Sequence, residues 1–313
     1  MNSEELPQTL VDAVRYFGEP DVAFNFMRQL RWPEGVKCPR CQTTKVSFIS
    51  TRKTWECRCC TKPKQFSIKT GTIFEDSHLA LDKWLVAIWL IANAKNGISS
   101  YEIHRALGVT QKTGWFMLQR IRLAMQTGTF EKFKGDVEID ETFIGGKARN
   151  MHPGRRKRSG IRTGSTGKSA VIGFLERGGK VRAFPLQSQR RAIIDPIVRE
   201  NVEKGANVFT DELSSYDQLG DEYLHQVIRH AEKYVEGQVH TNGMENFWSL
   251  LKRGIKGTYV SVDPEHLFRY LDEQMFRFNN RKINDAGRFL MASTSVIGRH
   301  LSYKELIGSE SAA

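Results

Sequence analysis

Cysteine is confined to one short stretch of this chain of 313 residues. All five cysteines lie between Cys38 and Cys60, and residues 61–313 have none. This clustering excludes a disulfide framework spread through the fold. In an intracellular chain, an odd number of cysteines packed so closely argues for a metal site instead.

Long apolar runs are also lacking. The longest, Trp84 to Ala92, has nine residues, far short of the ~20 needed to cross a bilayer. The opening MNSEELPQTL has no basic stretch followed by an apolar one, so we expect no secretory signal. No internal repeat is visible, which excludes a solenoid. We expect a soluble intracellular protein.

Acidic residues are fewer than basic residues in this chain. The chain has 35 acidic residues against 47 Lys plus Arg, a net charge of +12. This balance favours a polyanionic partner, with nucleic acid first and an anionic membrane surface second. Between Thr142 and Lys168 there are eight basic residues and no acid. We expect this Gly/Ser-rich insert to fold onto a DNA backbone, the alternative being a solvated loop. The candidate DNA contacts in it are Arg155, Arg156, Lys157 and Arg158.

The length allows about two domains or one large domain with small modules. We predict an α/β multidomain protein, in which an RNase H-like mixed-sheet catalytic domain is preceded by a zinc ribbon and a helix-turn-helix. The predicted boundaries are N-terminal helices at 1–30, a zinc ribbon at 31–75, a helical DNA-binding region at 76–132, the catalytic domain at 133–290 and a C-terminal tail at 291–313.

Two cysteine pairs have the spacing of a zinc ribbon. Cys38 and Cys41 are followed after fifteen residues by Cys57 and Cys60. Two such turns bring four thiolates into a tetrahedron, and four protein ligands leave no position for a catalytic water, so the single Zn²⁺ is predicted to be structural. Cys59 is a surplus thiol that could replace either neighbour as a ligand. Buried cysteines without a metal are the alternative.

The pattern of residues 99–125 predicts a helix-turn-helix. Ser99 or Ser100 can cap a first helix ending at Leu107, Gly108 can supply the turn, and Thr110 can cap a second helix to about Met125. The start of the second helix then exposes three side chains that can reach base edges or phosphates. These are Gln111, Lys112 and Thr113. Such three-helix cores also serve as packing or dimerisation units.

Acidic residues follow or interrupt predicted strands. In the strand that begins near residue 136, apolar alternation puts Glu138 and Asp140 on one face. Further strands are expected at 169–176 and 181–187, a helix at 190–203, and a strand from 206 that ends in Asp211. That order is typical of the RNase H-like fold. Later helices are predicted at 243–253, carrying Glu245 and Lys252 on one face, and at 264–279, the last clear element.

Carboxylates from two strands and a helix suit a pair of Mg²⁺ or Mn²⁺ ions, which prefer hard oxygen ligands. Asp140, Asp211 and Glu245 are the candidate ligands. We expect Glu138, Glu141 and Glu212, which flank them in the sequence, to have supporting or structural roles only.

The blocks VEIDETFIGGK, VFTDELSSY and HTNGMENFWSLLKRG, together with CPRC, QFSIKTGTIFEDS and GVTQKTGWFMLQRIR, occur in order. Over residues 15 to 285 the chain resembles bacterial insertion-sequence transposases of the DDE superfamily, in the group with an N-terminal zinc ribbon and an RNase H-like domain. The resemblance implies that Asp140, Asp211 and Glu245 are catalytic metal ligands and that Lys252 contacts a DNA phosphate. Some subgroups have Asn or His at the third position, and Asn242 and His240 lie one turn upstream.

The resemblance further implies a two-metal reaction. Water cuts a phosphodiester at each transposon end, and the freed 3′-hydroxyl attacks target DNA. The implied partners are transposon ends and target DNA, with a homo-oligomer in the synaptic complex, no membrane, and a cytoplasmic, nucleoid-associated location. The alternatives are a domesticated DNA-binding regulator with a relic catalytic domain and an RNase H-like nuclease without strand transfer.

Overall fold

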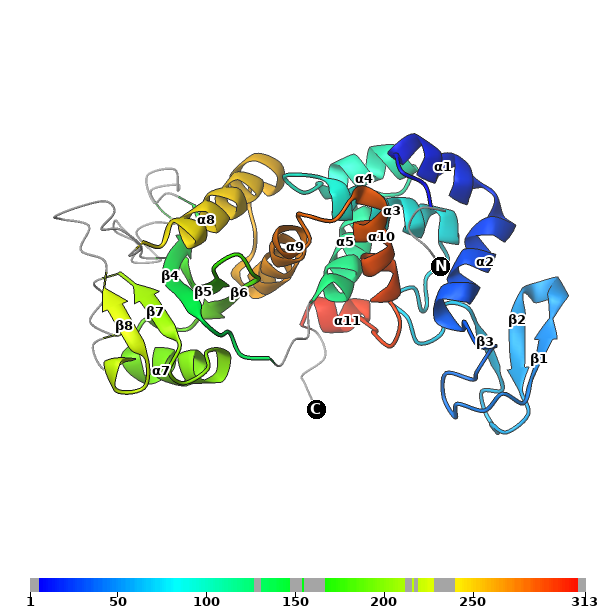
Figure 1. The fold of residues 1–313 in the computed structure, drawn as a ribbon. Helices are drawn as coiled ribbons and strands as arrows, with labels where there is room; N and C mark the ends of the chain where they lie inside the picture. Colours follow the sequence, from blue (N-terminus) through cyan, green and yellow to red (C-terminus); the bar gives the residue numbers. More distant parts are fainter. Residues whose placement is uncertain are drawn as a thin grey trace. The chain divides into compact units, whose positions relative to one another are not determined.

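The structure is a computed structural model that describes residues 6–126, 131–146, 154, 167–211, 216, 219–227 and 240–308. The chain divides into two compact units (Figure 1). Met1–Gln126 and Asn280–Ala313 form the first unit, and Thr127–Asn279 form the second. Within the described ranges, no helix is long and apolar enough to cross a membrane.

The first unit begins with two short helices, as predicted. Helix α1 (Leu10–Gly18) starts where the Thr9 side chain accepts a hydrogen bond from the backbone N–H of Asp12, and α2 (Pro20–Arg31) starts at a proline. Both features are typical of a helix N-terminus.

A three-stranded antiparallel sheet follows, made of β1 (Val46–Ile49), β2 (Thr54–Cys57) and β3 (Gln65–Ser67). Trp55 of β2 stacks on Phe66 of β3 and on Phe24 of α2, with ring centroids 5.9 and 5.6 Å apart. This aromatic packing gives the small module an apolar core beside its cysteines.

The predicted helix-turn-helix is formed by α4 (Ser100–Leu107) and α5 (Gln111–Met125), after α3 (Leu81–Asn93). The side chain of Ser99 caps α4, and Gly108 ends it with a φ of 61°. Thr110 caps α5. These end signals act locally, which is why they could be found in the sequence.

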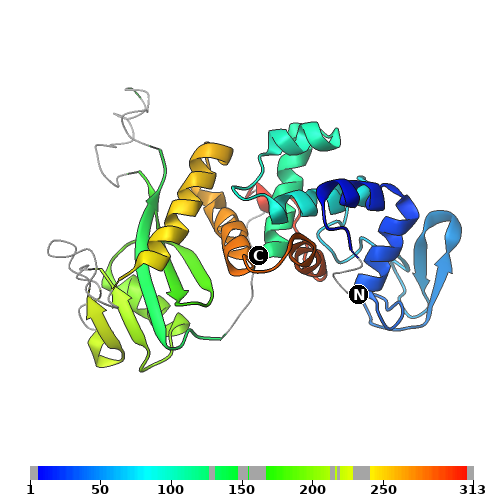
Figure 2. The ribbon, with the colours of Figure 1, turned by 45° about the horizontal axis from the view of Figure 1, so that its top comes forward.

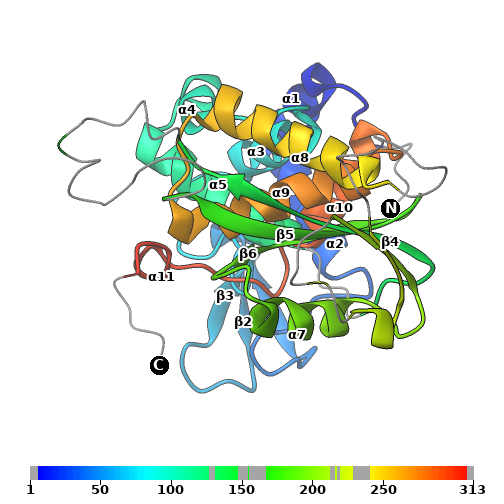
Figure 3. The ribbon, with the colours of Figure 1, turned by 90° about the vertical axis from the view of Figure 1, so that its left-hand side faces the viewer.

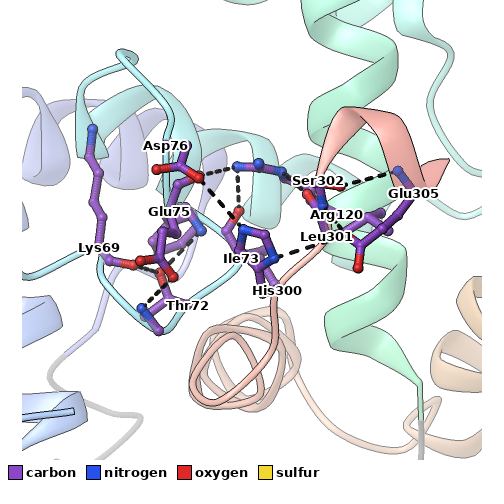
Figure 4. A network of polar contacts seen from close by, with 12 residues as sticks. Lys69, Thr72, Ile73, Glu75, Asp76, Arg120, His300, Leu301, Ser302 and Glu305 are labelled. Carbon is purple, nitrogen blue, oxygen red and sulfur yellow. Dashed lines mark hydrogen bonds and ion pairs between the residues drawn. The ribbon is translucent and has the colours of Figure 1, made fainter. Parts of the chain in front are cut away.

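Two C-terminal helices extend beyond the predicted last element, α10 (Asp285–Thr294) and α11 (Tyr303–Leu306). Residues 291–313 were expected to form a tail, and residues up to 290 were assigned to the catalytic domain. Phe289 of α10 instead packs on Trp89 of α3, with ring centroids 5.2 Å apart. Figure 4 shows the next segment tied to α5, where buried Arg120 donates to the backbone oxygens of Leu301 and Ile73, each at 2.9 Å.

The second unit is built on a five-stranded mixed sheet. Its strands are β4 (Asp136–Ile144), β5 (Ser169–Glu176), β6 (Val181–Leu186), β7 (Asn207–Thr210) and β8 (Leu224–Val227). Their order is β6-β5-β4-β7-β8. The β4-β5 and β5-β6 pairs are antiparallel, whereas β7 and β8 continue from β4 in parallel. In chain order this is 3-2-1-4-5, the RNase H-like arrangement, as predicted.

Helices cover both faces of this sheet (Figures 2 and 3). On one face α7 (Arg191–Asn201) buries Ile194 and Val198 against strand residues such as Ile139. On the other face lie α8 (Asn242–Gly254) and α9 (Leu267–Asn279), which join a second apolar cluster. The central strand β4 therefore lies between two cores, and its acidic side chains are spread from Asp136 to Glu141.

Candidate active site and zinc centre

The register of the parallel strands β4 and β7 brings Asp140 and Asp211 level with each other. Asp136, Val137 and Glu138 pair with Asn207, Val208 and Phe209. Continued by two residues, this register sets position 140 beside position 211, directly after β7 ends. Strand β4 continues to Ile144, so Asp140 lies in the middle of one strand and Asp211 directly follows its shorter parallel neighbour. The structure thus brings together two of the three predicted carboxylates.

Glu141 joins them. Asp140, Glu141 and Asp211 each offer a carboxylate oxygen, and these three oxygens all lie within 4.8 Å of one another. The hydroxyl of buried Tyr216 donates a hydrogen bond to Oε1 of Glu141. Glu141 was expected to have only a supporting or structural role. Beyond Glu138, β7 no longer pairs with β4, so the Glu141 side chain can reach Asp211 past the end of that strand.

Helix α8 contacts β4 at two matched points. The backbone N–H of Met244 donates to Oε2 of Glu138 at 2.9 Å, and Nε1 of Trp248 donates to Oδ2 of Asp140 at 3.0 Å. Two residues along a strand and four along a helix both advance about 6–7 Å. The distance from Glu138 to Asp140 therefore matches that from Met244 to Trp248, and both contacts can form. Glu138 is buried and also bonded to Nε of Arg177 at 3.0 Å. Its role is to hold the start of α8.

Gly173 of β5 makes this close approach of α8 possible. A Cβ at Gly173 would lie 2.2 Å from Cε of Met244 and 2.6 Å from the Trp248 ring. Only glycine leaves room for these two side chains, and Trp248 in turn contacts Asp140.

A pocket of about 550 Å³, here called the carboxylate pocket, opens at this point. Asp140, Glu141, Glu245 and Lys252 are among the residues that line it. Glu245 is exposed on the first turns of α8, outside the close group of three oxygens among the described residues. The structure therefore gathers all the predicted catalytic residues except Asp211 along one pocket, and Asp211 adjoins it through Asp140.

The two alternatives for the third position lie elsewhere. Nδ1 of His240 is 3.5 Å from Oε1 of Glu138, and its carbonyl oxygen accepts from Arg177 at 2.7 Å. His240 is thus engaged at the anchored start of α8. Asn242 is exposed at the first position of that helix, one turn before Glu245.

Two of these carboxylates have raised pKa values. Burial raises the pKa of Asp140 to about 6, helped by the charges of Asp211 and Glu245. Burial likewise raises the pKa of Glu141 to about 7 against the lowering effect of the hydrogen bond from Tyr216, with smaller contributions from the charges of Asp211 and Asp140. Closely spaced carboxylates repel one another when all are ionised, and a bound cation removes this repulsion. The all-oxygen donor set fits a hard divalent cation.

Four of the five cysteines form the second metal-binding group. Cys38, Cys41, Cys57 and Cys60 present sulfur atoms within 4.8 Å of one another. Two backbone N–H groups, of Cys59 and Cys60, each donate to Sγ of Cys57 at 3.4 Å. The pKa of Cys57 falls to about 6, because these donors and the neighbouring thiols outweigh the opposing effect of burial. Thiolates so arranged fit Zn²⁺. Sγ of Cys59 lies instead 3.6 Å from the Thr43 hydroxyl.

The three side chains predicted to read DNA at the start of α5 have contacts within their own unit. Nε2 of Gln111 donates to the Ser100 hydroxyl at 2.8 Å, and the hydroxyls of Thr113 and Thr110 are 2.8 Å apart. Lys112 is exposed, and its Nζ lies 4.5 Å from the centre of the Tyr303 ring of α11. Residues 155–158 and Glu212 lie outside the described residues.

Comparison with known proteins agrees with this geometry. Residues 132–279 match the ISXO2-like transposase domain, and residues 19–63 match the transposase zinc-ribbon domain. An uncharacterized protein in transposable element ISH50 of Halobacterium salinarum is 28% identical over 263 residues, covering 80% of this chain and 87% of the relative. An uncharacterized transposase-like protein of Haemophilus influenzae is 35% identical over 105 residues, covering 33% of this chain and 85% of the relative.

The fold is that of an RNase H-like domain, which carries a group of carboxylates that could hold a divalent metal ion and is joined in this chain to a zinc ribbon. The chain belongs to the insertion-sequence transposases that combine a transposase zinc ribbon with an ISXO2-like transposase domain. The resemblance found in the sequence blocks is therefore confirmed.

Proposed function

We propose that this transposase binds the ends of its element and catalyses Mg²⁺-dependent DNA cleavage and strand transfer. The observation that carries the proposal is the closeness of Asp140, in the middle of β4, and Asp211, directly after the parallel strand β7, beside a pocket that also presents Glu245 and Lys252. Phosphodiester chemistry needs such carboxylates close together and a cation near the phosphate.

In this proposal the carboxylates of Asp140, Asp211 and Glu245 hold two Mg²⁺ or Mn²⁺ ions, with Glu141 beside them. When bound, the two ions supply activation of the attacking oxygen and stabilisation of the leaving oxygen. Lys252 contacts a DNA phosphate. Trp248 holds the Asp140 carboxylate in place through its 3.0 Å hydrogen bond.

The reaction has two displacements at phosphorus. In the first, water attacks the phosphate at the element's end, and the bond to the 3′-oxygen breaks, leaving a 3′-hydroxyl. In the second, that hydroxyl attacks a target phosphate, displaces the target's 3′-oxygen and joins the two DNAs. Neither displacement requires a covalent bond to the protein.

DNA recognition is assigned to three places. The zinc ribbon and the start of α5, with Gln111, Lys112 and Thr113, would recognise the element's ends. The basic residues Arg155 to Arg158, outside the described part of the chain, would hold the DNA backbone near the carboxylates. Since two ends must be joined, we expect two or more copies of the chain in the synaptic complex, which light scattering with and without end DNA can count.

The proposal is tested with DNA carrying the inverted repeats that flank the gene. Wild-type protein with Mg²⁺ should cleave this DNA and join it to a plasmid, whereas Asp140→Ala, Asp211→Ala and Glu245→Ala should each lose both activities. Exposed Asp221 of the same unit offers a matched control, and Asp221→Ala should remain active. Wild-type protein that binds the ends and cleaves nothing would support the regulator instead. Activity retained in one site variant would remove that residue from the mechanism.

A further inference from the structure

A second pocket adjoins the carboxylate pocket. It has a volume of about 200 Å³ and is lined by both apolar and basic side chains. Phe143, Ile144 and Ile255 give it apolar walls, and Lys168, Lys252 and Lys256 give it three cations, with no acidic residue among the described residues that line it. We call it the lysine pocket.

The lysine pocket and the carboxylate pocket share two residues, Lys252 and Lys256. Lys252 lies near the end of α8, and Lys256 lies in the π-helix Ile255–Tyr259 that continues it. The two pockets are therefore parts of one continuous surface, and a DNA strand whose phosphate lies at the carboxylates would place its next phosphate near these lysines.

Lys168 reaches the lysine pocket from the start of β5. Ile144 and Ser169 pair at the ends of β4 and β5, and Gly145 follows with a φ of 154°. A Cβ at Gly145 would lie 3.1–3.3 Å from three atoms of Lys168, so a glycine is needed for Lys168 to approach this closely. The fold thus brings Lys168, which directly precedes β5, to the same pocket as Lys252 of α8 and Lys256 of the π-helix.

The ammonium groups of Lys168 and Lys256 lie close enough to Lys252 to affect its pKa. The pKa of Lys252 is lowered, first by burial and then by the charges of Lys256 and Lys168, against the opposing effect of Asp140. Cations held together at a partly apolar surface are stabilised by an anion. In DNA the phosphodiester oxygens carry one negative charge, and the neighbouring deoxyribose offers carbon atoms for the apolar walls to contact.

We propose that the lysine pocket binds the DNA phosphodiester next to the one that is cleaved, with Lys168 and Lys256 contacting its oxygens and the apolar walls contacting its deoxyribose. This inference rests on the proposed transposase reaction and adds a DNA-binding subsite to it. The neighbouring phosphodiester could belong to the transposon strand or to the target strand, and the experiment below distinguishes the two.

The test removes the charge of one DNA phosphate, the charge of one lysine, or both. DNA is made with a single uncharged methylphosphonate linkage at successive positions around the reacting phosphate, and wild-type protein is compared with Lys168→Ala, Lys256→Ala and Lys168→Arg. The control is Lys180→Ala, since Lys180 is an exposed lysine in the turn after the opposite end of β5. The reactions measured are cleavage of the transposon end and joining of a pre-cleaved end to target DNA.

We expect one methylphosphonate position to slow wild-type protein about tenfold and to slow Lys168→Ala little further, because both changes remove the same contact. Lys168→Arg should keep most of the wild-type rate. An effect in the cleavage reaction assigns the subsite to the transposon strand, and an effect confined to the joining reaction assigns it to the target strand.

A binding measurement that does not depend on activity accompanies the rates. With Ca²⁺ in place of Mg²⁺, the salt dependence of DNA binding should fall by about 0.7–0.9 in slope for each lysine contact removed. Wild-type protein that cleaves while Lys168→Ala and Lys256→Ala match Lys180→Ala in rate and slope would overturn the subsite alone. Wild-type protein inactive on both substrates would contradict the proposed reaction itself.

Discussion

A methyl group added at Gly173 should displace α8 and with it the pocket. In the Gly173→Ala variant the new Cβ would lie 2.2 Å from Cε of Met244 and 2.6 and 2.8 Å from two atoms of the Trp248 ring, where ordinary contacts are 3.4–4 Å. Met244 can turn its flexible end away. The rigid indole ring cannot, so it must move by roughly 1 Å, as expected for overpacking.

The size of the effect follows from this displacement. Overpacking of this kind costs about 1–3 kcal/mol of unfolding free energy, against total stabilities of about 5–15 kcal/mol, so the variant should fold. A shift of about 1 Å in a group that positions a reacting carboxylate costs about a hundredfold in rate. DNA cleavage should therefore fall far more than stability.

Urea unfolding and a cleavage assay measure the two effects in parallel. Gly220→Ala is the matched control, because a Cβ at this position of the same unit meets nothing within 4 Å, and it should stay within about 0.5 kcal/mol of wild type. Wild-type cleavage by Gly173→Ala, with an unchanged hydrogen bond from Trp248 to Asp140 in its crystal structure, would refute the argument that Gly173 sets the position of α8.

Three further predictions concern metal and proton binding. Removal of zinc with a chelator should unfold the cysteine module, seen as a loss of far-ultraviolet circular dichroism, and Cys57→Ser should bind no zinc while Cys59→Ser binds one ion per chain. Because the pKa values of Asp140 and Glu141 are raised to about 6 and 7, protons compete with metal below pH 7. Mn²⁺ affinity measured by calorimetry should thus rise steeply from pH 5.5 to 7.5 and then level off, and a flat profile would contradict the pKa assignment. Trp248→Phe removes a hydrogen bond that lowers the Asp140 pKa, so its pH–rate profile should move to higher pH, and a profile superimposable on that of wild type would contradict this role.

The parts of the fold that could be predicted from the sequence depend on local chemistry. Ser99, Gly108 and Thr110 cap or end their helices through contacts with residues a few positions away, and the cysteine spacing acts within two short turns. The succession of β4, β5, β6, α7 and β7 in the second unit was also predicted from the succession of apolar segments, whereas β8 was not predicted.

The parts that could not be predicted depend on distant contacts. Helix α10 is stabilised by Phe289, which packs against Trp89 and Phe17 from far along the chain. Glu141 was given only a supporting or structural role, yet the early end of β7 leaves space for it beside Asp211. One signal was present, since Glu141 directly follows the predicted ligand Asp140 in the sequence.

Metal ligation by the carboxylates of Asp140 in β4 and Asp211 directly after β7 is the central claim, and cysteine substitution tests it most directly. A thiolate binds Mg²⁺ poorly and Mn²⁺ better, because Mn²⁺ is the softer ion. Asp140→Cys and Asp211→Cys should therefore be inactive in strand transfer with Mg²⁺ and recover activity with Mn²⁺, and the same exchange at Glu245 and Glu141 shows which of the two completes the site. If both aspartate variants bind DNA as wild type does and stay inactive with Mn²⁺, or are fully active with Mg²⁺, these residues do not hold the catalytic ions.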